Sequence, residues 1–332
     1  MIDKDITFFH RHKDSGFSIN KVFQNFISTF TNSKIIQYYL PSLGARPISL
    51  IKNLIFALKN RGEINHISGD VHYIILALLG KKNVLTIHDL VFLKNSKNKI
   101  DYYYKYIFWL YLPVKISTIV TTISEKTKNE ILNLVHKDNI VVIHNAVGSE
   151  FIEDPYIEPK SGCFNILHIG TGWNKNLKNV VLALKKLKHL NFSLTIVGKL
   201  QEDQEELLLD SGIRYNNKIN LTDIEVYNEY CLSHIISFPS LFEGFGMPII
   251  EGQKVGRPIL TSHIEPLKEV ANDSALFVDP NDIDSIAVGF EQLLTDIELR
   301  HLLIMKGREN VKRFSPDFIA SQYIKIYEQL GK

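Results

Sequence analysis

The chain has 332 residues, of which 45% are hydrophobic and 22% charged, with a formal net charge of +2. These values are typical of a globular α/β protein with room for two domains, and they exclude a disordered or multi-spanning membrane chain. Residues 1–155 carry 19 basic against 13 acidic residues. Scattered, solvated lysines are the simpler explanation of this excess. An anionic acceptor or an anionic membrane surface is the alternative.

The N-terminal segment has no signal-peptide core, which predicts a cytoplasmic protein, with a peripheral place at the inner membrane face as an option. Residues 102–120 form the most apolar window, but lysines and a proline interrupt it, so it is too short to span a bilayer. Its many aromatic residues fit a core-facing helix better than an interfacial one. No basic stripe with interleaved aromatic residues is present, so nucleic acid is not an expected partner.

Short apolar runs alternate with amphipathic stretches along the chain, which predicts parallel strands joined by crossover helices. In the first half, strands are expected at residues 5–10, 34–40, 64–67, 83–87, 117–122 and 140–144. Helices are expected at residues 19–30, 48–58, 72–79, 100–112 and 125–135.

Residues 153–162 contain two prolines and a glycine without periodicity, which indicates a linker. Beyond it, strands are expected at residues 164–169, 193–197, 235–238, 258–261 and 275–278. Helices are expected at residues 176–188, 204–209, 223–231, 247–255, 264–270, 283–294, 297–314 and 316–330.

This pattern predicts an α/β fold with two Rossmann-like, doubly wound domains, residues 1–152 and 163–314. Residues 315–332 form a C-terminal helix that can pack back on the first domain. Such sheets bind ligands at the carboxyl ends of their strands, so we expect the two domains to face a cleft.

The most informative segment follows the strand predicted at residues 235–238. Gly244 and Gly246 allow the backbone to approach a ligand closely, and a helix begins directly after them. The loop therefore points backbone N–H groups and the positive end of a helix dipole at its ligand, which suits a phosphate. Glu243 and Glu251 bracket the loop and supply acceptors for sugar hydroxyls. A nucleotide-sugar pocket is the economical interpretation.

A second glycine-containing turn follows the strand predicted at residues 164–169. Gly170 and Gly172 offer backbone amides to a phosphate, but the spacing lacks a third glycine and Trp173 intrudes, so it is no dinucleotide fingerprint. Lys175 stands at a helix start, where the dipole disfavours a cation. A pyrophosphate that needs neutralising explains this lysine.

Two loops of the first half carry weaker signals. His88 and Asp89 end an apolar strand, where they could bind a sugar hydroxyl or simply form a turn. Gly16 and Ser18 follow the first strand, where the loop could contact a phosphate or an acceptor, and Ser18 could equally be an N-cap.

No metal site is expected. Asp282 and Asp284 superficially resemble a metal-binding pair, but they fall at a predicted helix start, where acidic residues stabilise the N-terminus. Lys175 with the helix dipole removes the electrostatic need for a cation.

With these motifs, the chain resembles the retaining glycosyltransferases of family 4, which have two Rossmann-like domains in the GT-B arrangement and are also termed glycosyl transferases group 1. The segment from Glu243 to Glu251 matches the Glu-x7-Glu motif of that family. Further resemblance lies in residues 86–90, 122–125, 142–146, 256–262, 267–270 and 278–280.

The resemblance implies roles for the charged residues. Glu243 would hold hydroxyls of the donor sugar, Glu251 the ribose hydroxyls, and Lys175 the diphosphate. His88 would face the donor sugar, which makes His88 and Glu243 the candidate catalytic residues.

The resemblance also implies donor-binding residues in the surrounding loops. These residues are Gly16, Gly170, Thr171, Gly244, Phe245, Gly246 and Leu267. Thr171 departs from the family, because many relatives carry arginine shortly before the lysine. Neutralisation of the diphosphate would then rest on Lys175, alone or with Lys178.

The expected activity is metal-independent transfer, with retention, from a nucleoside-diphosphate-sugar to a glycan or lipid-linked acceptor in bacterial surface polysaccharide synthesis. No cofactor is expected. Alternatives are another GT-B enzyme, such as a nucleotide-sugar epimerase, and a non-catalytic nucleotide-sugar-binding protein. A phosphorylase would need a cofactor-bearing lysine site, which is not found. The joint presence of Glu243, Glu251 and Lys175 argues against a protein that has lost its site.

Overall fold

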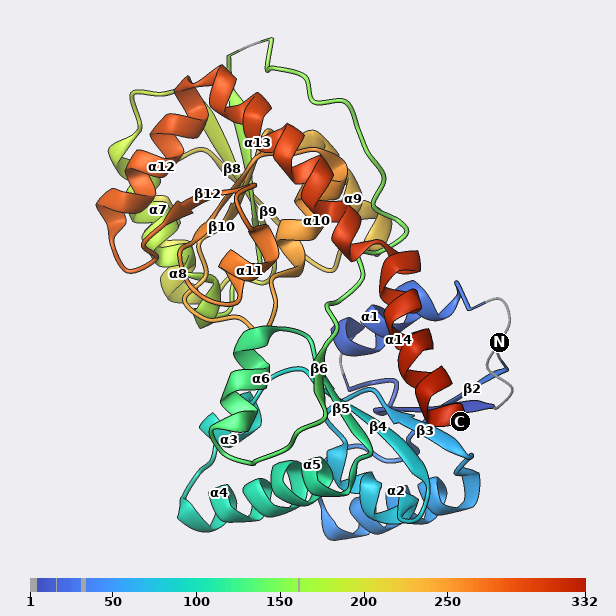
Figure 1. The fold of residues 1–332 in the computed structure, drawn as a ribbon. Helices are drawn as coiled ribbons and strands as arrows, with labels where there is room; N and C mark the ends of the chain where they lie inside the picture. Colours follow the sequence, from blue (N-terminus) through green and yellow to red (C-terminus); the bar gives the residue numbers. More distant parts are fainter. Residues whose placement is uncertain (1–4, 16, 31–33, 161) are drawn as a thin grey trace. The chain divides into compact units, whose positions relative to one another are not determined.

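The computed structural model describes residues 5–15, 17–30, 34–160 and 162–332. The chain forms two compact units. Unit 1 comprises Met1–Ala146 and Ser315–Lys332, and unit 2 comprises Val147–Phe314 (Figure 1). Among the described residues, no helix is both long and apolar enough to cross a membrane.

The described part of unit 1 is built on six parallel strands in the order β2-β1-β3-β4-β5-β6. The strands are β1 (Ile6–His10), β2 (Ile35–Tyr39), β3 (Ile64–Ile67), β4 (Lys82–Ile87), β5 (Ile119–Thr122) and β6 (Ile140–Val142). The helices are α1 (Phe17–Ile27), α2 (Pro47–Asn60), the 3-10 helix η1 (His72–Leu78), α3 (Val91–Lys94), α4 (Lys99–Lys105), the π-helix η2 (Tyr106–Tyr111), α5 (Leu112–Ile116), α6 (Glu125–Leu132) and α14 (Pro316–Gly331).

The helix expected at residues 100–112 is instead three consecutive pieces, α4, η2 and α5. Pro113 lies at the start of α5. A proline has no backbone N–H, so it cannot make the α-helical bond to the residue four positions earlier. The π-turn of η2 falls at this interruption.

The C-terminal helix α14 packs on the sheet of unit 1. Tyr327 of α14 contacts the imidazole of His66 on β3, with 2.5 Å between the hydroxyl oxygen and Nδ1. The other nitrogen, Nε2, lies 2.7 Å from the hydroxyl of Thr86 on β4. Burial lowers the pKa of His66 well below its ordinary value, so the ring is neutral and joins the helix to two strands without a charge.

Six parallel strands also form the sheet in the described part of unit 2, in the order β12-β11-β10-β7-β8-β9. The strands are β7 (Phe164–Ile169), β8 (Phe192–Val197), β9 (Tyr215–Lys218), β10 (Ile235–Phe238), β11 (Ile259–Ser262) and β12 (Leu276–Val278). The helices are η3 (Trp173–Lys175), α7 (Leu177–Lys186), α8 (Glu202–Ser211), α9 (Asp223–Leu232), α10 (Met247–Val255), α11 (Leu267–Ala271), α12 (Ile283–Thr295), α13 (Ile297–Asn310) and η4 (Val311–Phe314).

Most strands and helices agree with the sequence-based expectation to within one or two residues, and β9 is the strand that was missed. It reads Tyr-Asn-Asn-Lys and lies at the edge of its sheet, mostly exposed. A strand in that position buries little side chain, so it lacks the apolar run by which strands are recognised.

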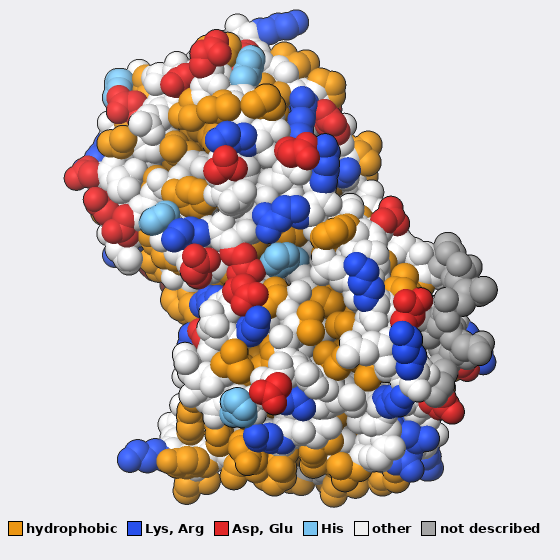
Figure 2. Space-filling model, in the orientation of Figure 1, with side chains coloured by type: hydrophobic (Ala, Val, Ile, Leu, Met, Phe, Trp, Pro, Cys, Tyr) orange, Lys and Arg blue, Asp and Glu red, His pale blue; other side chains and the backbone are white. Residues whose placement is uncertain are grey.

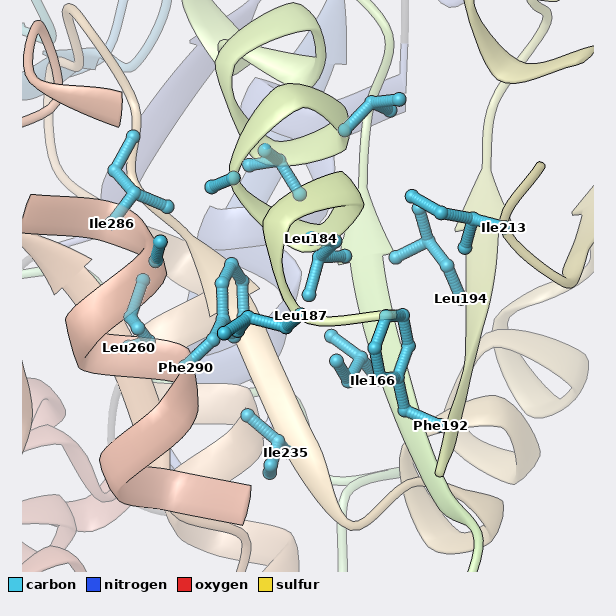
Figure 3. Close-up of a cluster of buried hydrophobic side chains, with 14 of the residues drawn as sticks. Ile166, Leu184, Leu187, Phe192, Leu194, Ile213, Ile235, Leu260, Ile286 and Phe290 are labelled. Atoms are coloured by element: carbon cyan, nitrogen blue, oxygen red, sulfur yellow. The ribbon is translucent and has the colours of Figure 1, made fainter. Parts of the chain in front are cut away.

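The apolar core of unit 2 fills the space between the sheet and two helices (Figure 3). Leu184 of α7 and Phe290 of α12 pack over Ile166 of β7 and Leu260 of β11, and all four are buried. This packing fixes the strands whose carboxyl ends carry the loops described below.

In both units the strand order reverses beside the first strand. The chain passes from β7 outward to β8 and β9, then returns to the other side of β7 with β10. In unit 1 the same reversal separates the neighbours β2 and β3 of β1. Adjacent loops diverge at such a point and leave a crevice at the carboxyl edge of the sheet.

Residues 147–162 belong to unit 2, although the sequence suggested a domain end at residue 152 and a free linker after it. Arg300 is held by Glu158 through two bonds, Nε to Oε1 at 3.0 Å and Nη2 to Oε2 at 2.8 Å. Arg257 pairs with Asp154 and also donates to its carbonyl oxygen at 3.0 Å. Both guanidinium groups are buried, so the segment supplies the counter-charges that unit 2 requires.

We expect Glu158→Ala to lower the free energy of unfolding by about 2 kcal/mol, because it leaves the charged Arg300 buried without its carboxylate. Urea unfolding followed by circular dichroism measures this loss. Glu153→Ala is the matched control, since its ion pair with Arg308 in the same segment is exposed and should be worth under about 0.5 kcal/mol. Equal effects of the two variants would contradict the structural role of the Arg300 pair.

Candidate functional site

The turn after β7 places Lys175 over Gly170. Gly170 has φ +92°, and a Cβ there would lie 2.9 Å from Cγ of Lys175, so the position requires glycine. The side chain of Asn176 then fixes the end of the turn, donating to the carbonyls of Pro239 at 2.9 Å and Pro280 at 2.7 Å. Three loops at the carboxyl edge of the sheet are thereby joined.

Lys175 and Glu243 form an ion pair across two of these loops, with 2.7 Å between Nζ and Oε1. The side chains are only 22% and 13% exposed. Asn174 donates to the same carboxylate oxygen at 3.2 Å, and the ammonium lies 4.7 Å from the ring centroid of Phe238. The two charged residues expected to bind diphosphate and sugar therefore lie in contact, and both border the strand reversal.

His168 lies on β7 beneath this pair and adds no charge to it. The side chain is fully buried, and Nδ1 lies 3.2 Å from the hydroxyl of Ser237. Burial and the neighbouring Lys175 lower the pKa of His168 to about 3. His168 was not among the residues expected from sequence. A histidine within an apolar run at the end of a strand was the available signal.

Thr171 is anchored by its neighbours. Its hydroxyl donates to the carbonyl of Lys199 at 2.6 Å, and its own carbonyl accepts from Gln204 at 2.9 Å. The methyl group faces Gly198, where a Cβ would come within 3.1 Å. Because its hydroxyl donates to the carbonyl of Lys199, Thr171 anchors the turn and adds no positive charge to it.

The loop before α10 is supported from below by buried side chains. Gly246 has φ +120°, and a Cβ there would lie 2.7 Å from Leu267. Leu267 is fully buried, and Phe245 is buried against Phe314 with 5.9 Å between ring centroids. Leu267 and Phe245 thus position the loop with their side chains, while the half-buried Gly244 lies between Glu243 and this support.

Glu251 lies on α10 and accepts a hydrogen bond from the hydroxyl of Tyr230 on α9, at 2.7 Å to Oε2. Burial, together with the adjacent carboxylate, raises the pKa of Tyr230 well above its ordinary value, so the phenol stays a donor. Tyr230 was not among the residues expected from sequence. An apolar-looking helix position gives no sign that its hydroxyl orients a carboxylate.

A pocket of about 500 Å³ opens beside the turn after β7. Trp173, Lys178 and Leu241 line it, together with residues at the start of α8. Trp173 is 75% exposed, which is unusual for an indole and leaves its face available for stacking.

In unit 1, His88 follows β4 and is nearly buried. Its Nε2 donates to the carbonyl of Ser68 at 2.8 Å, and burial lowers its pKa, so the ring is neutral with its proton on Nε2. Nδ1 is then a hydrogen-bond acceptor. Asp89 precedes α3 and accepts a hydrogen bond from the backbone N–H of Val91 at 2.9 Å, which is the turn-forming role. Gly16 lies outside the described residues.

A second pocket, of about 370 Å³, lies where the strand order of unit 1 reverses. Arg11 and His12 after β1 line it, with Asp70 after β3 and Trp109 of η2. Arg11 and Asp70 face each other at 3.9 Å. None of these residues was expected from sequence, because they come together only when their strands lie side by side in the folded sheet.

Among the described residues, no group of three or more histidine, cysteine or acidic side chains could hold a metal ion. Asp282 caps α12 by accepting from the backbone of Asp284 at 2.9 Å, and Asp284 pairs with Lys186. Both acidic residues therefore have a structural partner at the helix start.

Comparison with known proteins agrees with this architecture. Residues 166–310 match the family described as Glycosyl transferases group 1. The chain is 27% identical over 275 residues to the O-antigen chain mannosyltransferase B of Escherichia coli, covering 75% of this chain and 71% of that protein.

Solved structures agree in fold at low sequence identity. A glycosyltransferase from Rickettsia africae superposes with a TM-score of 0.76 at 20% identity, over 99% of both chains. Anabaena HepE in complex with UDP and glucose superposes with a TM-score of 0.79 at 12% identity, over 98% of this chain and 100% of that one. Residues 166–310 of unit 2 are therefore similar to the Glycosyl transferases group 1 family, and the chain has the two-sheet α/β fold of GT-B structures.

Proposed function

We propose that the protein is a retaining glycosyltransferase of family 4 that moves a sugar from a nucleoside-diphosphate-sugar to a glycan or lipid-linked acceptor without a metal ion. The observation that carries this proposal is the Lys175–Glu243 pair at the strand reversal of unit 2. A cation for phosphate and a carboxylate for hydroxyls are the two groups such a donor needs side by side.

The donor is proposed to lie along the loops after β7 and β10. Lys175 exchanges its carboxylate partner for the diphosphate, and Glu243, thus released, accepts from hydroxyls of the sugar. Glu251, oriented by Tyr230, accepts from the ribose hydroxyls. Backbone N–H groups around Gly170 and Gly244 complete the anion site.

During transfer, the bond between the anomeric carbon and the phosphate oxygen breaks as the bond to the acceptor oxygen forms on the same face. Negative charge grows on the leaving diphosphate, and each hydrogen bond directed at it contributes about 2–4 kcal/mol. The acceptor proton passes to the leaving phosphate oxygen. In this scheme Lys175 stabilises the leaving diphosphate, and no covalent intermediate with the enzyme is required.

Unit 1 is proposed to bind the acceptor. Its 370 Å³ pocket combines the cation of Arg11 with the indole of Trp109, groups that suit an anionic or sugar-containing acceptor. Nδ1 of His88 is proposed to accept a hydrogen bond from a hydroxyl of the donor sugar. The similarity to an O-antigen chain mannosyltransferase supports mannose as the sugar and a surface polysaccharide as the product. A cytoplasmic protein at the inner membrane face fits such a product.

Donor turnover tests the proposal directly. We expect diphosphate release from one of a panel of UDP-, GDP- and ADP-sugars, with a GDP-linked mannose the first candidate. The rate should be unchanged by EDTA, because an ammonium and backbone dipoles replace a divalent ion. A requirement for added Mg²⁺ or Mn²⁺ would exclude metal-independent transfer, and no release from any donor would remove the enzymatic proposal.

Lys175→Ala and Glu243→Ala should each slow turnover at least tenfold, equivalent to about 1.4 kcal/mol of barrier. Steady-state kinetics with the preferred donor measure the effect. The control is Lys186→Ala, which removes an exposed lysine of α7 that pairs with Asp284. Wild-type rates in both site variants would show that the chemistry occurs elsewhere.

Tyr230→Phe should raise KM for the donor about fivefold with a smaller change in kcat, because one hydrogen bond worth about 1 kcal/mol no longer orients Glu251. Tyr227→Phe on the same helix is the control, since its hydroxyl contacts Cys231. An effect on thermal stability without an effect on KM would assign the Tyr230 bond to folding alone.

A further inference from the structure

The helix α2 of unit 1 is apolar on two sides. One side packs inward, with Ala57 buried and Leu50 and Leu54 partly buried against the core. The other side carries a row of exposed residues at helical spacing. This outer row is Ile48, Ile51, Ile55 and Leu58, which are 48–70% exposed. A surface helix of a globular protein normally has polar residues there.

The helical segment α4–η2 repeats this arrangement. Leu110 is buried, and Tyr102, Tyr106 and Trp109 pack partly against the core. The outward side has large apolar and aromatic residues at the spacing of successive helical turns. This second outer row is Ile100, Tyr103, Tyr104, Ile107, Phe108 and Tyr111. The aromatic residues that the sequence assigned to a core-facing helix are therefore divided between the core and the surface.

Both helical segments cover one face of the sheet. Each packs on the short helix η1, and residues of all three join the same core cluster. The ring centroid of Tyr73 on η1 lies 4.9 Å from that of Trp109, and the hydroxyl of Tyr73 accepts from Asn53 of α2 at 2.8 Å. Figure 2 shows hydrophobic side chains gathered over α2 and α4, along the lower edge of the view. We call the two outer rows together the apolar face.

The apolar face is surrounded by positive charge. Residues 46–61 and 94–116 contain nine lysine and arginine residues against one acidic residue, Asp101, in a chain with a net charge of only +2. Asp101 is paired with Lys105 at 2.8 Å. The exposed basic side chains are Arg46, Lys52, Lys59, Arg61, Lys94, Lys97, Lys99 and Lys115. Of these, Lys94 is engaged with Glu130.

We propose that the apolar face binds an anionic lipid bilayer in the plane of its surface. Isoleucine and leucine side chains enter the acyl boundary, tyrosines remain at headgroup level, and the surrounding lysines and arginines meet lipid phosphates. The charge identifies this occupant. A second copy of the chain would bring the same positive rim against itself, and a neutral partner would gain nothing from it.

This inference concerns unit 1 alone and does not require the proposed donor chemistry. Where that chemistry holds, binding to the bilayer implies that the acceptor is a lipid-linked glycan presented there. The reason is that Asn53, Tyr73 and Trp109 of the 370 Å³ pocket belong to the helices that carry or support the apolar face.

Vesicle flotation tests the inference with the full-length protein. We expect it to float with vesicles of phosphatidylcholine and phosphatidylglycerol at low salt, and at least tenfold less with phosphatidylcholine alone or in high salt. The double variant Ile51→Ser, Ile107→Ser and the charge variant Lys52→Glu, Lys59→Glu should each lose at least tenfold in partitioning. The matched control is Val288→Ser, Met305→Ser, which removes two exposed apolar residues of unit 2 and should float like wild type.

Wild-type failure to float with anionic vesicles, or flotation that both test variants retain, would overturn the inference. A concentration-dependent dimer in light scattering that the serine variant abolishes, without lipid binding, would assign the face to self-association and equally refute it. Circular dichroism and melting curves verify that each variant folds. Diphosphate release with the soluble donor reports on unit 2 separately, so loss of flotation with intact release would leave the glycosyltransferase proposal untouched.

Discussion

An ammonium and a carboxylate 2.7 Å apart, largely removed from water, hold together two loops that are 68 residues apart in the chain. Lys175 comes from the turn after β7, and Glu243 comes from the loop after β10. They meet because β7 and β10 are hydrogen-bonded neighbours at the place where the strand order reverses. Charges in such a setting attract more strongly than in water, and each is costly to leave without a partner. A ligand that displaces one must supply an equivalent charge or hydrogen bonds.

Much of unit 2 serves to hold this pair in place. Asn176 ties the turn after β7 to two other loops, and Leu267 lies directly beneath Gly246. Burial keeps His168 on β7 neutral, so this histidine adds no second positive charge beside Lys175. The loops that carry the two charged side chains are preorganised, because packing and hydrogen bonds within unit 2 hold them in place. Preorganisation of this kind is what electrostatic stabilisation of a leaving group requires.

Two helical segments of unit 1 are apolar on both their buried and their exposed sides. α2 and α4–η2 each give one apolar side to the core and a second apolar side to the exterior. Folding of the unit accounts for the first side only. The second side exposes large hydrophobic groups to water, which is unfavourable in free energy and contributes nothing to folding. Contiguous exposed apolar surface of this kind marks an interaction site. The lysine and arginine residues around the apolar face favour an anionic partner.

The sequence by itself determined the alternation of strands and helices, the doubly wound fold class and the charged loop from Glu243 to Glu251. These features are local: an apolar run, a glycine pair and a helix start are all properties of neighbouring residues. The roles assigned to His88, Glu243 and Lys175 remain predictions from motif and resemblance.

Only the tertiary structure decided which distant side chains meet. The contact of Tyr230 with Glu251, the pocket around Arg11 and Asp70, and the attachment of residues 147–162 through Arg257 and Arg300 all depend on strand order and helix packing. The sequence also did not show which residues of α4–η2 are buried, because large apolar and aromatic residues lie on both sides of this helical segment. Which side faces solvent depends on what packs against it, and periodicity alone does not contain that information.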